Sequence, residues 1–137
     1  MKSRAVQSLF ISIGMLMASI AHAQRNYAEP ILPAACDQYF KAADACMINA
    51  IHYYERVDVR AAGQWREFLA EMGKVENAIH REVATAGEAA VAERCTRPQF
   101  VNGMVNSLTG LILTLASAHA LDDDCASASS DLQLPRQ

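Results

Sequence analysis

Several short motifs that carry enzyme chemistry are missing from this 137-residue sequence. It has no nucleophile elbow, P-loop, dinucleotide-binding fingerprint or His-Glu-x-x-His zinc motif. It also has no Cys-x-x-Cys pair, which argues against a thioredoxin-like site, a zinc ribbon and covalent haem attachment. We therefore expect a protein that is not an enzyme and that has no catalytic, cofactor-binding or metal-binding residues.

Basic clusters and strand patterns are absent as well. The chain has 12 Lys and Arg residues against 15 Asp and Glu residues. An acidic chain without basic clusters is poorly suited to nucleic acid, which is bound largely through its phosphates. No internal repeat and no sustained alternation of apolar and polar residues is present, so the sequence predicts an all-α protein.

The first 23 residues have the layout of a secretory signal peptide. Lys2 and Arg4 precede an apolar run over residues 9–20, and an Ala-x-Ala ending follows at residues 21–23. Such a segment is removed on export, and the run is short for a membrane span, which needs about 20 apolar residues. We expect a mature chain from about Gln24, with 10 basic and 15 acidic side chains and hence a net charge of −5. We expect it in the periplasm or outside the cell, with no membrane span.

Two alternatives concern the same segment. The apolar run could remain as an uncleaved anchor, although the Ala-x-Ala ending argues against this. The residues before Cys36 superficially resemble a lipid-attachment box, but Arg25 and Glu29 lie between the apolar run and this cysteine, and Pro33 stands where such a box has Leu. We therefore favour a signal peptide over residues 1–23 and an extended lead-in over residues 24–33.

Apolar residues recur at steps of three and four in three segments, which indicates amphipathic helices. The first helix is predicted over residues 34–55. The second is predicted over residues 59–86, with Asp58 as its N-cap and a short helical extension beyond Gly87.

The third helix is predicted to start beside Cys95. Thr96 followed three residues later by Gln99 is a capping box, and Pro98 is tolerated in a first helical turn. Three aspartates at residues 122–124 oppose the dipole of this helix at its C-terminal end, so we expect them to help stop it. The helical domain is predicted over residues 34–125 and a disordered tail over residues 126–137.

Four cysteines, Cys36, Cys46, Cys95 and Cys125, lie in the predicted mature chain. An even number in a small exported chain predicts two disulfides, with metal-bound thiolates as the weaker alternative. In an antiparallel bundle Cys36 and Cys95 lie at one end, while Cys46 lies about 15 Å along the first helix, too far for a Cys36–Cys46 bond. This favours Cys36–Cys95 with Cys46–Cys125 over Cys46–Cys95 with Cys36–Cys125. The predicted fold is an antiparallel bundle of three helices, or four if a glycine divides one, stapled by two disulfides.

The segment that begins Cys36-Asp-Gln-Tyr39-Phe40 and continues to Asp44 resembles a group of small exported bacterial proteins of uncharacterised function. These open with a Cys-x-x-Tyr-Phe…Asp helix and have a second Cys further along, which is Cys95 here. The resemblance implies a Cys36–Cys95 disulfide and implies no activity. Cys46 and Cys125 depart from the group's pattern.

Three sets of residues are candidate ligand sites. His52, His80 and His119 lie on three different predicted helices, and a three-histidine metal site is a less favoured interpretation than solvated histidines. Three methionines could suggest copper(I), and three aromatic residues could stack on a ligand, but both sets fall at core positions. These residues are Met47, Met72, Met104, Tyr53, Tyr54 and Trp65.

The residues favour binding of a periplasmic protein through a helical face, as an inhibitor or immunity protein would. The candidate partner face is acidic and suits a basic partner; it comprises Glu67, Glu71, Glu76 and Glu82. A small-ligand or metal-binding bundle and a structural or stress-protective envelope protein are the alternatives. The uncharged stretch over residues 108–118 is interpreted as buried core in preference to an interface.

Overall fold

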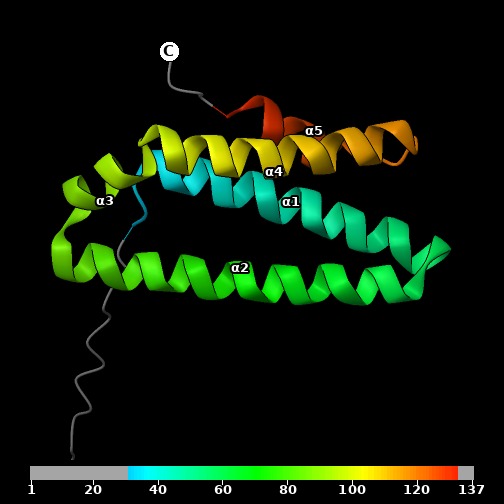
Figure 1. Cartoon of the computed structure of the whole chain (residues 1–137), viewed down its shortest axis with the longest axis horizontal. Coiled ribbons are helices and arrows are strands. Elements are labelled where there is room, and N and C mark those ends of the chain that lie inside the picture. The colour runs from blue at the N-terminus through cyan, green and yellow to red at the C-terminus, as the bar shows by residue number, and fades with distance from the viewer. Residues whose placement is uncertain (1–30, 133–137) are drawn as a thin grey trace, which may run out of the picture.

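The computed structural model describes residues 31–132, which form five helices and no strand (Figure 1). These are α1 (Ala34–Val57), α2 (Val59–Ala86), α3 (Glu88–Cys95), α4 (Pro98–Ser117) and α5 (Asp123–Ser130). The long helices α1, α2 and α4 alternate in direction, which confirms the predicted all-α antiparallel bundle. The predicted signal peptide and all but the last three residues of the lead-in lie outside the described range.

Helix α1 is the centre of the fold because every other helix packs against it. Its buried side follows the predicted spacing and includes Phe40, Ala43, Met47 and Ala50. In Figure 1, α1 lies between α2 on one side and α4 on the other. The bundle is therefore open, since α2 and α4 share α1 as a neighbour but make few contacts with each other.

Helix α2 begins and ends at the two residues that the sequence indicates. The Asp58 carboxylate accepts hydrogen bonds from the backbone N–H groups of Arg60 and Ala61, at 3.0 and 3.2 Å. Gly87 ends the helix with a φ of 89°, which glycine adopts without a steric cost. The segment beyond it is a separate helix, α3, rather than an extension of α2. Gly103 and Gly110 do not divide α4.

The predicted capping box at the start of α4 is wrong. Thr96 lies at the end of α3, where its hydroxyl donates to the carbonyl of Glu93 at 2.9 Å. Arg97 occupies the N-cap position of α4 without a side-chain hydrogen bond, and Pro98 is the first helical residue. The Thr96 hydroxyl therefore bonds back to the preceding helix instead of forward, while the prediction for Pro98 is confirmed.

The predicted disorder from residue 126 is also wrong up to Ser130, because residues 123–130 form α5. Asp122 caps this helix: its carboxylate accepts from the backbone N–H of Cys125 at 2.9 Å. Asp123 and Asp124 occupy the first turn, where the helix dipole favours acidic side chains. The three aspartates start α5, whereas α4 has already ended at Ser117.

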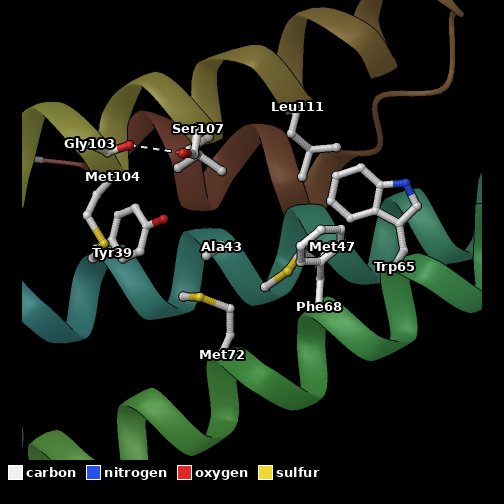
Figure 2. Close-up of a pocket in the computed structure, with 11 residues that line it drawn as sticks. Tyr39, Ala43, Met47, Trp65, Phe68, Met72, Gly103, Met104, Ser107 and Leu111 are labelled. Carbon is white, nitrogen blue, oxygen red and sulfur yellow. Dashed lines mark hydrogen bonds between the residues drawn. The ribbon is translucent and has the colours of Figure 1, made fainter.

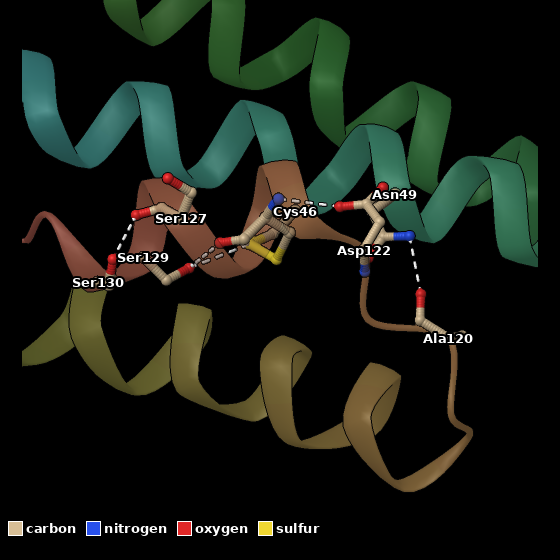
Figure 3. Close-up of a disulfide and its surroundings, with 8 residues drawn as sticks. Cys46, Asn49, Ala120, Asp122, Ser127, Ser129 and Ser130 are labelled. Carbon is tan, nitrogen blue, oxygen red and sulfur yellow. Dashed lines mark hydrogen bonds between the residues drawn. A yellow bond between two sulfur atoms is a disulfide. The ribbon is translucent and has the colours of Figure 1, made fainter.

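Both predicted disulfides are present. Cys36 bonds Cys95 with a Cα–Cα distance of 5.5 Å, and Cys46 bonds Cys125 with a Cα–Cα distance of 4.5 Å. All four cysteines are buried. The first bond attaches the end of α3 to the start of α1, and the second attaches α5 to the middle of α1 (Figure 3). Because Cys95 precedes α4 and Cys125 follows it, the two disulfides fix both flanks of α4 to the same helix.

Candidate functional site: an apolar groove between α2 and α4

An apolar pocket of about 520 Å³ lies between α2 and α4, with α1 as its floor (Figure 2). A pocket of this size falls in the range of small-molecule sites. It exists because α1 contacts both flanking helices while these two stay apart. Its lining residues are Tyr39, Ala43, Met47, Trp65, Phe68, Met72, Gly103, Met104, Ser107, Leu108 and Leu111.

Few polar groups reach this groove. The Ser107 hydroxyl donates to the carbonyl of Gly103 at 3.0 Å, so it is engaged within α4. The Tyr39 hydroxyl points into the groove in Figure 2, and burial of this residue raises the pKa of its phenol. Tyr39 therefore remains a neutral hydrogen-bond donor at physiological pH. The groove offers an apolar surface with one phenolic hydroxyl and the indole of Trp65.

Helix α2 carries large apolar side chains that the described chain leaves uncovered. Phe68, which lines the groove, is 60% exposed, and Val75, which lies outside the lining, is 47% exposed. Glu71 follows Phe68 by three residues and precedes Val75 by four, so it shares their face of the helix. Trp65 and Phe68 lie against each other, with ring centroids 5.7 Å apart. The α2 wall therefore presents an aromatic pair, and Glu71 lies on the same helix outside the groove lining.

The α4 wall has no charged side chain at all over residues 98–117. The predicted burial of its uncharged stretch holds only for Leu108, Leu111 and Leu115, while Leu113 is 64% exposed. Helix α4 is long and apolar enough to cross a membrane by length and composition, yet only 17% of its apolar window is buried. Its exposed side is uncharged but not apolar throughout, because it carries Asn102, Asn106 and Thr109 besides Leu113.

The acidic residues of the predicted partner face divide into two groups. Glu67 and Glu71 are exposed, and Glu71 accepts an ion pair from Lys74. Glu76 instead faces α1, where it lies close enough to Asp44 to raise the pKa of that carboxyl, after the larger effect of burial. Glu82 forms an ion pair with Arg94 of α3. The acidic partner face is therefore not one continuous patch.

The candidate metal ligands do not form a metal site. Among the described residues, no three His, Cys, Asp or Glu side chains lie close enough together to hold a metal ion. His52 and His119 are exposed and His80 is half-buried beside Glu76. The three methionines come from three helices and line the same groove, but in Figure 2 their sulfur atoms lie apart along it.

The aromatic candidates separate as well. Trp65 lines the groove, as a ligand-stacking residue would. Tyr53 and Tyr54 are half-buried against the core and contact each other edge to face, with centroids 5.0 Å apart. Neither tyrosine belongs to the groove. The groove is not predictable from the sequence because its lining comes from three helices, although the uncharged stretch over residues 108–118 marks part of the α4 wall.

The groove and the two cross-links define the class of this molecule: a small, disulfide-stapled, open helical bundle with an uncovered apolar face. Comparisons with known protein families, with curated proteins and with solved structures find no match for the chain.

Proposed function

We propose that this chain is an exported, non-enzymatic binding protein that accepts the apolar side of a partner protein's helix in the groove between α2 and α4. The single observation that supports this most directly is the uncharged helix α4, which is largely uncovered and forms one wall of an apolar groove. A partner helix placed there would complete a bundle of four helices around the face of α1 that is now open.

The composition of the groove suits a helical partner. Aromatic side chains that fill or line pockets contribute most of the binding free energy in many interfaces, and Trp65 and Phe68 are placed in this way. Methionine side chains adapt to different partner shapes. Amphipathic helices bind in such grooves through apolar residues at steps of three and four. Hydrophobic contact would therefore supply affinity at this site.

The acidic side chains of α2 would influence how a partner approaches. Glu67 and Glu71 are exposed on α2, the helix that forms one wall of the groove, although neither lines it. A basic side chain on the polar side of the bound helix would be attracted to them, which mainly raises the association rate. The two buried disulfides support export, because such bonds persist in oxidising compartments.

Site-directed photo-crosslinking tests this proposal. A benzophenone side chain introduced at position 68 in the groove wall is expected to form an adduct with a partner protein in the periplasm. The matched control places the same group at Ile48, which is 42% exposed on α1 and does not line the groove. Equal adduct yields at the two positions, or none at position 68, would contradict the proposed function.

A small apolar molecule is the second candidate occupant, and the pocket volume of about 520 Å³ favours it. The Tyr39 hydroxyl would donate a hydrogen bond to an acceptor on that molecule. Trp65 is the only tryptophan in the chain, so its fluorescence reports on the groove alone. Titration with a neutral apolar dye is expected to change this emission, and Phe68→Glu should weaken the dye's binding. No change in emission would exclude this candidate.

A further inference from the structure

We infer that the groove binds the unbranched alkyl chain of an uncharged, lipid-like molecule, and that this chain continues past the groove into a second, smaller cavity. The inference rests on the second candidate of the proposed function, a small apolar molecule, and it names the chemical class of that molecule. Two adjoining cavities support it, and within residues 31–132 no charged side chain lines either of them.

The smaller cavity, of about 180 Å³, lies beside the start of α4. Side chains of α1 and α4 form most of its wall, and Cys95 and Leu132 also line it. Tyr39 and Met104 line this cavity as well as the groove, so these two side chains form the partition between the two spaces. In Figure 2 they lie together at one end of the groove, away from Trp65. The smaller cavity therefore adjoins the groove at that end.

The shape of the combined site favours a linear chain. Its lining residues on α4 extend from Phe100 to Leu111, which is about 17 Å at 1.5 Å per residue. A bulky molecule could fill the groove, but only a narrow and flexible one can continue between Tyr39 and Met104. The methionine side chain is unbranched and changes its conformation readily, so it can move aside for such a chain. A partner helix, about 10 Å across, is too wide for the smaller cavity.

The polarity of the lining favours an uncharged ligand. An ionised carboxylate or phosphate that is buried without a positive partner is costly, and among the described residues no Lys, Arg or His lines either cavity. The lining supplies uncharged hydrogen-bonding side chains instead, with Tyr39 in both cavities and Gln38 and Thr96 in the smaller one. These groups suit a hydroxyl at one end of the ligand. A long-chain alcohol therefore represents the class of molecule that fits.

Tryptophan fluorescence of the disulfide-bonded protein tests the inference with straight-chain alcohols from hexanol to dodecanol. Trp65 lines the groove, so binding of an alcohol is expected to change its emission. In the wild-type chain the dissociation constant should fall about fourfold for each added methylene, which is the effect of burying one such group. Val105 lines the smaller cavity and not the groove. Val105→Phe should therefore leave hexanol binding unchanged and weaken dodecanol binding at least tenfold.

Leu113→Phe is the matched control. It places the same ring on α4 at a position that lines neither cavity and is 64% exposed. This variant should bind every alcohol as the wild type does, and circular dichroism verifies that both variants fold. A wild-type dissociation constant that does not depend on chain length would overturn the inference. A Val105→Phe protein that binds dodecanol as tightly as the wild type, or that weakens all the alcohols equally, would also overturn it.

The outcomes separate the inference from the proposed function. If the alcohols fail the test while the neutral apolar dye still binds in the groove, only the inference is wrong. If neither the dye nor any alcohol binds, the second candidate of the proposed function fails together with the inference. Binding of a partner helix is decided independently of both results, by the adduct of the benzophenone at position 68.

Discussion

The side chain of Asn49 holds the turn before Asp122 with two hydrogen bonds. Its amide donates to the carbonyl of Ala120 at 2.9 Å, and its carbonyl oxygen accepts from the backbone N–H of Asp122 at 3.0 Å (Figure 3). Asn49 is the only buried polar residue among those described, with 5% exposure. A single α1 side chain thus fixes the backbone between α4 and α5, in the turn from which Asp122 caps α5.

Replacing Asn49 by Ala is expected to lower the free energy of unfolding by about 2 kcal/mol, because two backbone groups lose their partners in a partly buried place. Urea unfolding followed by circular dichroism measures this loss. Asn77→Ala, on the exposed side of α2, should change stability by less than about 0.5 kcal/mol. If Asn49→Ala and Asn77→Ala lowered the free energy of unfolding equally, the two hydrogen bonds of Asn49 would not stabilise the fold.

Removing the disulfide between Cys46 and Cys125 should release α5 before the rest of the fold. A helix of 8 residues is too short to persist without tertiary contacts. The double variant with Ala at both positions is expected to lose about 4 kcal/mol in the chain-entropy model. Hydrogen exchange should show lost protection over residues 123–130 with protection in α1 largely retained. Uniform loss across all helices would contradict this local role.

The raised pKa of Asp44 predicts that the free energy of unfolding depends on pH. Burial, and then the nearby Glu76 carboxylate, raise the pKa of Asp44 in the folded protein above its usual 3.8. The folded state therefore binds the Asp44 proton more tightly than the unfolded state does. The free energy of unfolding falls as pH rises through the folded pKa, because Asp44 then carries its charge in a partly buried place. Asp44→Asn should be more stable than wild type at pH 7, and the difference should vanish below about pH 3.8.

Urea titrations of both proteins at several pH values measure this difference. Glu76→Gln is the companion variant, because it removes the charged neighbour while leaving Asp44 in place. It should show a smaller gain at pH 7, since burial is the larger cause of the raised pKa. A gain from Asp44→Asn that is the same at pH 3 and pH 7 would show that ionisation is not its cause.

His119 lies two residues beyond the end of α4 and adopts the left-handed region, with a φ of 53°. The following residue, Ala120, donates its backbone N–H to the carbonyl of Leu115 at 2.8 Å, which is the pattern of a helix C-terminal motif that usually contains glycine. His119→Gly is expected to raise the free energy of unfolding by about 1 kcal/mol, because glycine has no Cβ to strain. Ala118→Gly, one residue earlier at a φ of −84°, should lower stability instead. Thermal unfolding of both variants tests whether His119→Gly raises the melting temperature while Ala118→Gly lowers it.

Local signals in the sequence predicted much of the fold. The N-cap Asp58 and the end of α2 before Gly87 are predicted correctly because each depends on residues within one turn of the chain, whereas the separate helix α3 beyond Gly87 is not predicted. The prediction for Thr96 is wrong because a threonine between two helices can form its local hydrogen bond with either helix. Its hydroxyl donates to the carbonyl of Glu93 in the preceding helix. The sequence does not indicate that Thr96 bonds to the end of α3 instead of capping the start of α4.

The features that the sequence did not reveal depend on distant contacts. Helix α5 has a weak apolar pattern and exists as part of the fold through Cys125 and through Asn49, which lies more than 70 residues earlier. The groove likewise combines side chains from three helices, and only the packing of α2 and α4 on separate sides of α1 leaves it open. The uncharged stretch in α4 was recognisable in advance, but its exposure was not.

The positions of Cys95 and Cys125 give α4 a dependence on redox state. With both bonds formed, both flanks of the uncharged helix are held on α1. If the proposed partner binds there, this preorganisation would lower the entropy lost on binding. A newly made precursor with four thiols has only side-chain packing to hold the same helix in place. Formation of the two disulfides would then fix α4 in its place on α1, and their reduction would release it.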